Sequence, residues 1–167
     1  MAPQPPRDER AALELRLAQE DALYLAAKAT RDYDRITVAQ GELLDVPVGE
    51  LLARVRAGLR RAARQGDGAA YVGSTSDPGW RWKGGATLAE DGANVMVGHI
   101  TRWQRMVVLG AWPDKRCATM EVAAIAEARL AEQEYIEPAL VIANRADDAR
   151  GLHDRGHQQY SFVYLCW

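Results

Sequence analysis

One abrupt change from a helical to a strand pattern restricts this chain to folds that combine helices with a sheet. Residues 48–65 carry apolar side chains at helical spacing, and Pro47 precedes them, as proline often does at the start of a helix. This apolar stripe comprises Leu51, Leu52, Val55 and Leu59. A glycine-containing break at residues 66–68 ends the pattern, and residues 69–75 then have the composition of a strand that leads into a turn. The sequence therefore predicts an α/β or α+β domain.

The rest of the chain supplies two more helical stretches and several short apolar segments. Helices are predicted at about residues 8–30, where leucine and alanine are abundant, and at 117–134, which contain no glycine or proline. Further strands are predicted at residues 35–39, 106–112 and 160–167, with a short apolar segment at 139–143 and a short helix at about 94–105. There is no internal repeat and no low-complexity linker.

Composition excludes several classes of protein. The chain has 167 residues, 48% of them hydrophobic, which is enough for one domain core, and no apolar run is long enough to span a membrane. Its two cysteines, Cys117 and Cys166, exclude a disulfide-rich scaffold and fit an intracellular protein whose compartment is unknown. Residues 1–10 match neither a secretory signal nor a mitochondrial presequence. The net charge of -2 excludes nucleic-acid binding by bulk charge alone.

Positive charge is nevertheless concentrated in one part of the chain. Between residues 51 and 83 there are seven basic and two acidic residues. Arg56, Arg60 and Arg64 are four residues apart, so they share one face of the predicted helix, which then lies in solvent or meets an anion. We name these three arginines and Lys83 as candidate nucleic-acid contacts, and an acidic protein surface is the alternative partner.

The most informative motif is YVGSTSDPGWRWK, which begins at Tyr71. It contains Gly73 at the end of the predicted strand, Thr75 two residues later, and Arg81 ten residues after Tyr71. This pattern resembles the second half of the GIY-YIG nuclease core, where a YIG strand is followed by a turn and by an arginine on a helix. The resemblance implies a small, mostly antiparallel central sheet flanked by helices. We therefore divide the chain into an N-terminal arm and helical extension, residues 1–45, and a GIY-YIG-like domain, residues 46–167.

Two later positions extend the resemblance. The segment ATMEVAAI resembles the family's helix that carries a metal-binding glutamate, here Glu121, and Asn144 resembles an asparagine that often follows. The resemblance implies that Glu121 holds Mg²⁺ or Mn²⁺, that Tyr71 orients or deprotonates a water, and that Arg81 stabilises charge on the phosphate. Phosphodiester hydrolysis requires an activated water, a charge stabiliser and usually a divalent metal, so these residue types suit the chemistry.

The first half of the family core has no counterpart where the family places it. Residues 60–68 (RRAARQGDG) precede the YIG-like strand instead of a GIY strand, so one of the family's two tyrosines is unmatched. A histidine often follows the family's arginine by about four residues, but Gly85 stands there. His99 either supplies that imidazole from a later segment or is an ordinary surface residue, and we favour the surface interpretation.

Each candidate residue also has a purely structural interpretation. Tyr71 can pack within a sheet, Arg81 can stack on a neighbouring indole, and Glu121 can complement the dipole of its helix. Three functions therefore remain open. The chain is a metal-dependent endonuclease that hydrolyses DNA, or a catalytically inactive GIY-YIG-like fold that binds protein partners as a structural subunit of a larger complex. A nucleic-acid-binding module that does not cut is the third.

Overall fold

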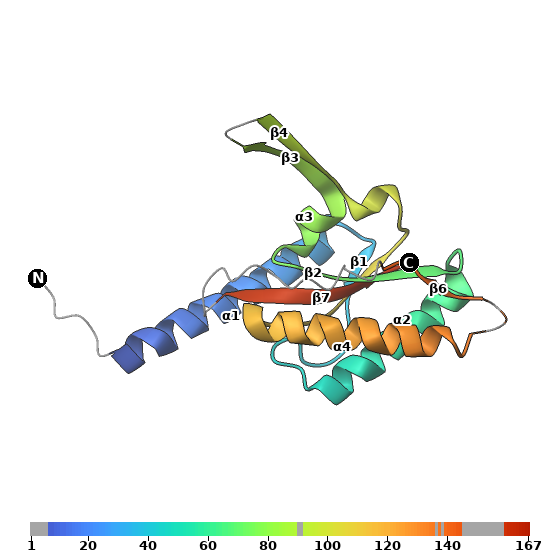
Figure 1. Cartoon of the computed structure of the whole chain (residues 1–167). Helices are drawn as coiled ribbons and strands as arrows, with labels where there is room; N and C mark the ends of the chain where they lie inside the picture. The colour runs from blue at the N-terminus through green and yellow to red at the C-terminus, as the bar shows by residue number, and fades with distance from the viewer. Residues whose placement is uncertain (1–6, 90–91, 136, 138, 145–158) are drawn as a thin grey trace, which may run out of the picture.

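A mixed five-stranded sheet forms the centre of the protein and has helices on both faces (Figure 1). The computed structural model describes residues 7–89, 92–135, 137, 139–144 and 159–167. Three long strands pair antiparallel in the middle of the sheet, and two short strands pair parallel at its edges. In spatial order the strands are β1 (Ile36–Val38), β5 (Met106–Pro113), β7 (Tyr160–Cys166), β2 (Ala69–Thr75) and β6 (Val141–Ile142). This arrangement confirms the predicted α/β class.

Two long helices, α2 (Val48–Gln65) and α4 (Asp114–Glu132), cover one face of the sheet. Three of the four residues of the apolar stripe predicted for α2, Leu51, Val55 and Leu59, are buried there against side chains of the strands, whereas Leu52 is half-buried. The shared core cluster includes Leu51, Val55, Leu59, Val72, Ile125 and Leu165. Each such side chain contributes about 1.5–3 kcal/mol through burial. Within the described residues, no helix is both long and apolar enough to cross a bilayer.

The other face of the sheet is covered by three helices, of which the first is much the longest. Its C-terminal half packs through Ala22, Ala26 and Ala29, which are buried and lie on one helical face. Its N-terminal half extends beyond the sheet (Figure 1). These helices are α1 (Arg7–Asp32), α3 (Pro78–Lys83) and the 3₁₀ helix η1 (His99–Thr101). The alanines keep α1 close to the sheet.

A two-stranded hairpin projects from this face, and the short helix predicted at about residues 94–105 is wrong (Figure 1). The hairpin consists of β3 (Gly84–Ala89) and β4 (Gly92–Val97), which pair antiparallel. Only residues 99–101 of the expected helix are helical, and they form a single 3₁₀ turn. The β-branched valines at 95 and 97 favour a strand, and the glycine-rich segment before them supplies its partner.

Part of the predicted N-terminal extension belongs to the central sheet. The strand expected at residues 35–39 is present as β1, which pairs with β5 from Ile36 opposite Met106 to Val38 opposite Val108. Residues on both sides of position 45 therefore contribute to one sheet. The division of the chain into two segments at that position stays a prediction.

Asn144 continues the sheet beyond the end of β6. Its side chain accepts a hydrogen bond from the backbone N–H of Val72 (3.0 Å) and donates one to the carbonyl of the same residue (2.6 Å). The side chain thus does what the backbone of a neighbouring strand would do, and only 6% of Asn144 is exposed. Both polar groups of Val72 are satisfied at the point where β6 ends.

Replacing Asn144 by alanine should lower the free energy of unfolding by about 1–3 kcal/mol, because the buried N–H and C=O of Val72 lose their partners. Urea denaturation measures the change. The matched control is Gln133→Ala, which removes an exposed amide and should change stability by about 0.5 kcal/mol or less. An Asn144→Ala protein as stable as the control would contradict this account of the sheet edge.

Candidate functional site

The hydroxyl of Tyr164 joins three elements beside the YVG segment. Strand β7 runs antiparallel to β2, and Tyr164 lies opposite Gly73 in their register. The Tyr164 oxygen accepts a hydrogen bond from Nε of Arg81 (3.2 Å) and lies 2.7 Å from Nε2 of His99. Side chains from β7, α3 and η1 therefore converge at the strand that carries the predicted motif.

Gly73 is required where two aromatic rings approach the strand. A Cβ atom at this position would lie 2.5 Å from the Tyr164 hydroxyl oxygen and 2.8 Å from Cε1 of Tyr71. The Tyr71 ring is 6.3 Å from that of Tyr164, 5.2 Å from that of His99, and stacked at 6.3 Å on Trp103. Tyr71 thus packs within an aromatic cluster, yet it remains half-buried rather than enclosed.

The sequence TSDP positions Arg81 by starting helix α3. Asp77 is the N-cap residue, and its carboxylate accepts a hydrogen bond from the backbone N–H of Trp80 (3.0 Å). Thr75 accepts a hydrogen bond from the N–H of Asp77 (3.1 Å), and Pro78 occupies the first helical position. The arginine therefore lies on a helix that follows the strand and turn, as the resemblance implies.

A second glycine brings His99 to the same place. A Cβ atom at Gly98 would lie only 2.3 Å from the carbonyl of Lys83, so the chain before η1 passes directly against the end of α3. His99 follows this close approach and reaches the hydroxyl of Tyr164. The interpretation of His99 as an ordinary surface residue is wrong, because its ring is half-buried between Tyr71 and Tyr164.

The protonation states keep the groups that contact Arg81 neutral. Burial, together with the charges of Arg81 and Arg102, lowers the pKa of His99 to about 4, so the ring is neutral at pH 7. Burial raises the pKa of Tyr164 well above its usual range, and the phenol stays protonated. Burial also acts to lower the pKa of Arg81, but interactions with Tyr164 and then Tyr71 outweigh it and raise that pKa. Arg81 is the cation around which the neutral groups are arranged.

Glu121 approaches β2 from the opposite side. The carboxylate is 5% exposed and accepts a hydrogen bond from the hydroxyl of Ser74, which directly follows Gly73. Successive side chains of a strand point to opposite faces, and Ser74 accordingly meets α4. Because α4 begins at Asp114, Glu121 lies beyond the first turn, where the helix dipole has little effect. The dipole interpretation of Glu121 is therefore not supported.

The chemistry of these donors fits a divalent metal held largely by its substrate. A carboxylate and a neighbouring hydroxyl are hard oxygen donors, which Mg²⁺ prefers. Among the described residues there is no group of three histidine, cysteine, aspartate or glutamate side chains that could enclose an ion. A metal at Glu121 would therefore take most of its ligands from outside the protein, as Mg²⁺ often does.

The predicted arginine face is not brought to this cluster. Helix α2 lies on the face of the sheet opposite Tyr71 and Tyr164. Arg56 forms ion pairs with Glu127 of α4 and, at 2.8 Å, with Glu134 just beyond the end of α4, so its anionic partners are carboxylates of the same chain. Arg60 and Arg64 are exposed, and their contact with phosphate stays a prediction. Lys83, by contrast, is exposed on α3, two residues from Arg81.

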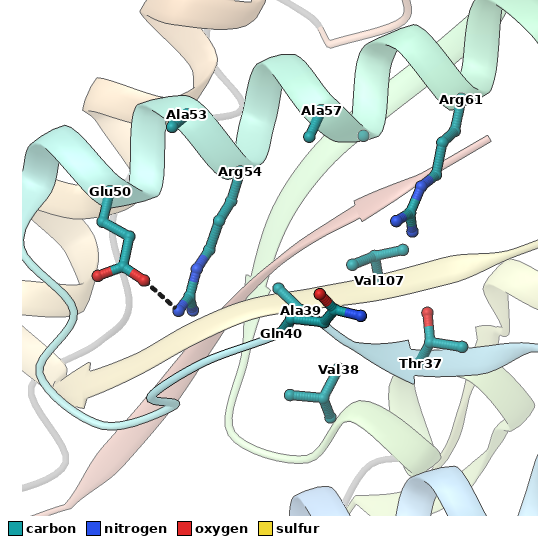
Figure 2. Close-up of a pocket in the computed structure, with 11 residues that line it drawn as sticks. Thr37, Val38, Ala39, Gln40, Glu50, Ala53, Arg54, Ala57, Arg61 and Val107 are labelled. Carbon is teal, nitrogen blue, oxygen red and sulfur yellow. Dashed lines mark hydrogen bonds and ion pairs between the residues drawn. The ribbon is translucent and has the colours of Figure 1, made fainter.

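A cavity of about 420 Å³ also lies on the α2 side, between this helix and β1 (Figure 2). Arg54 and Arg61 both extend into it from α2 (Figure 2). Arg54 is nevertheless committed to the fold, because it donates hydrogen bonds to Glu50 (2.6 Å) and to the carbonyl of Leu109 (2.7 Å). The guanidinium thus connects α2 to β5. The cavity itself shares no lining residue with the Tyr164 cluster.

No family model, curated protein or solved structure matches this chain. The assignment of a function therefore depends on the geometry of the site. Sequence analysis identified Tyr71, Arg81 and Glu121, but it missed Tyr164 and Trp103. The strand that carries Tyr164 was predicted, but its pairing with β2 was not, because a single sequence does not specify which strands are neighbours.

Stability should depend on the protonation of His99. The pKa of His99 is about 4 in the folded protein, whereas its ordinary value, expected in the unfolded chain, is 6.5. Between pH 4 and 6.5 the unfolded chain therefore binds more protons than the folded protein. The stabilisation linked to the neutral ring is complete above pH 6.5 and is lost as the pH falls through 4.

We expect the melting temperature of the wild type to fall toward that of His99→Gln as the pH decreases over this interval. Glutamine can replace the hydrogen bond to Tyr164 but does not titrate, so the difference between the two proteins isolates the histidine. Thermal melts across the pH series measure it. A difference that stays constant from neutral pH down to pH 4 would contradict the buried neutral ring.

Proposed function

We propose that this chain is a metal-dependent endonuclease domain that hydrolyses phosphodiester bonds of DNA through a GIY-YIG-like site assembled in permuted chain order. The observation that supports this proposal is the position of Tyr164, opposite Gly73 on the antiparallel neighbour of the YVG strand. A second tyrosine therefore lies beside the first, although no GIY strand precedes β2. Strand β7 supplies it from a later part of the chain.

The permuted order is physically sound because a site depends on which strands are neighbours and not on their order in the chain. Strands β7 and β2 pair over five consecutive positions, from Tyr71 opposite Cys166 to Thr75 opposite Phe162. This pairing fixes the distance between the two tyrosine side chains as firmly as a hairpin would. A preceding strand joined to β2 by a short turn would give the same arrangement.

In this proposal each polar group has a distinct task. Arg81 provides the positive charge that stabilises the phosphate as negative charge develops, and its planar guanidinium suits phosphate oxygens. Tyr71 interacts with Arg81 through its hydroxyl and is half-buried, so it orients the attacking water. Tyr164 is fully buried and therefore acts as a positioning residue that fixes Arg81 and His99. A metal ion at Glu121 would supply Lewis-acid chemistry on the α4 side of β2, the face opposite Arg81.

A plasmid-nicking assay tests the proposal. We expect the wild type to nick DNA with Mg²⁺ or Mn²⁺ and not with EDTA. Glu121→Ala should abolish nicking, because it removes the carboxylate donor. Arg81→Ala should slow nicking by about 100-fold or more, as loss of one charge stabiliser does in other enzymes. Thermal melts of each variant separate catalysis from folding.

Tyr164→Phe provides a sharper test of the permuted site, since it removes only the hydroxyl that holds Arg81 and His99. We expect slower nicking, because Arg81 loses the group that orients it. The metal concentration needed for half-maximal nicking should stay unchanged, because Tyr164 does not contact Glu121. Tyr135→Phe is the matched control, because Tyr135 packs on the α2 and α4 side of the sheet and should keep full activity. Nicking that survives both Glu121→Ala and Arg81→Ala would exclude this site as the source of activity.

The second candidate function is that of a structural subunit with an inactive site. The exposed surface of α1 favours it, because the first half of this helix extends beyond the sheet (Figure 1) and several apolar side chains along the helix are exposed to solvent. They are Leu13 (45% exposed), Leu15 (38%), Leu17 (48%), Leu23 (48%) and Tyr24 (60%). Exposed apolar surface on this scale is typical of a protein-binding helix.

Under this second candidate, the double variant Leu13→Glu and Leu17→Glu should release the protein from a larger complex while leaving it folded. Deletion of residues 1–30 would be less informative, because it also removes the buried alanines of α1. Sizing of tagged full-length protein in native extracts measures the complex. Leu130→Glu is the control, since Leu130 is 56% exposed on α4. An unchanged complex size in the double variant, together with DNA nicking, would exclude this alternative.

A further inference from the structure

A cavity of about 310 Å³ lies between α1 and α3, next to the helix that carries Arg81. Two residues of α3, Trp80 and Lys83, form one side of it, and they flank Arg81 in the sequence. Lys28 of α1 and Tyr33, which follows α1, form the other side. The short helix α3 thus contributes Arg81 to the Tyr164 cluster and its neighbours to this cavity.

Small residues allow the two helices to touch and leave the hollow beside the contact. A Cβ atom at Gly79 would lie 3.5 Å from Cε2 of Tyr33 and 3.6 Å from Cβ of Ala29. The backbone of α3 therefore approaches α1 closely at this point. The longer side chains of Trp80 and Lys83 lie around the contact and border the cavity instead of filling it.

The charges around the cavity leave positive groups available to an anion. Lys28 and Lys83 are exposed, and no ion pair within the described residues involves either ammonium group. The lining also holds two carboxylates, which balance the formal charge of the two lysines but are held by other groups. Asp77 caps α3 through the N–H of Trp80, and Asp32 lies 3.5 Å from Nε of Arg31.

An aromatic surface accompanies these cations. Trp80 is 37% exposed, although large aromatic side chains are usually buried in a domain of this kind. Bases of single-stranded nucleic acids stack on exposed aromatic rings while neighbouring cations hold their phosphates. A volume of about 310 Å³ is near the lower end of small-ligand pockets, and it suits one nucleotide better than a longer segment.

We propose that this cavity binds one unpaired nucleotide of a nucleic-acid strand, with its base against Trp80 and its phosphate held by Lys28 and Lys83. The inference rests on the proposed function, because Arg81 would hold the adjoining phosphate that is cleaved. A paired base presents only its edges, so stacking on Trp80 requires a strand that is single or locally opened at this position. The substrate is therefore a single-stranded or junction-containing nucleic acid.

Binding in the absence of metal tests the inference separately from cleavage. The probe is a short fluorescently labelled oligothymidylate, and fluorescence anisotropy with the full chain in EDTA measures its affinity. We expect Trp80→Ala to weaken binding about tenfold, as removal of a stacking ring does elsewhere, and Trp80→Phe to retain most of the affinity. A blunt duplex labelled in the same way should show no dependence on Trp80.

The lysines are tested by salt dependence. Loss of one phosphate contact to a single strand should reduce the slope of log affinity against log salt by about 0.7 in the Lys28→Ala, Lys83→Ala double variant. Lys115→Ala is the control, because Lys115 is exposed on α4 and lines no part of this cavity. Its slope should equal that of the wild type.

Each outcome decides the matter. Unchanged single-strand affinity in folded Trp80→Ala, or an equal loss on single strand and duplex, would overturn the nucleotide pocket. If binding depends on Trp80 but the wild type cuts neither single-stranded nor duplex DNA with Mg²⁺ or Mn²⁺, the proposed function fails and the pocket stands. If the wild type cuts and neither binding nor cutting depends on Trp80, the pocket alone fails.

Discussion

The antiparallel pairing of β7 with β2 is the interaction on which the rest of the structure depends. It occupies the centre of the sheet, so both clusters of the core form on strands that it holds together. The same register sets Tyr164 opposite Gly73, where the absence of a Cβ atom gives room for two tyrosine rings. A shift by one residue would turn Tyr164 to the opposite face and would place Val163 or Leu165 beside Arg81. The packing of the sheet and the geometry of the site are therefore set by one register.

Electrostatically, the site sets the guanidinium of Arg81 among groups that are kept neutral, with Arg102 at the neighbouring ring of Trp103. Burial and the charge of Arg81 keep His99 unprotonated, and burial keeps Tyr164 protonated. Because neither group carries charge at pH 7, neither neutralises Arg81, and its positive charge can act on a ligand beside Tyr71. Glu121 provides a buried negative charge on the opposite side of β2, and the strand separates the two groups.

The parts of the site that are close in sequence could be predicted, and the parts that come from distant strands could not. Tyr71 and Arg81 are joined by a strand, a capped turn and one helical turn, so their spacing alone implies proximity. Tyr164 and His99 depend on strand pairing and on the close approach at Gly98, which no local pattern encodes. The hairpin of β3 and β4 was missed because its glycines and valines lack the alternation of a half-buried strand. The partners of Arg56 come from α4 and the residues just after it, which are distant in sequence, so the sequence alone leaves its charge available to phosphate.

The central position of β7 has a consequence for how the protein is made. Of the five strands, β7 is the last to leave the ribosome, yet it lies between β5 and β2. Until it emerges, both of these strands have an unsatisfied edge in the middle of the future sheet, which is the kind of surface that pairs with other chains. Contacts across more than eighty positions, such as Arg81 with Tyr164, also make for slow folding. A nascent chain that stops short of Tyr160 lacks the strand that closes the centre of the sheet, and such an open sheet is the kind of surface that chaperones protect.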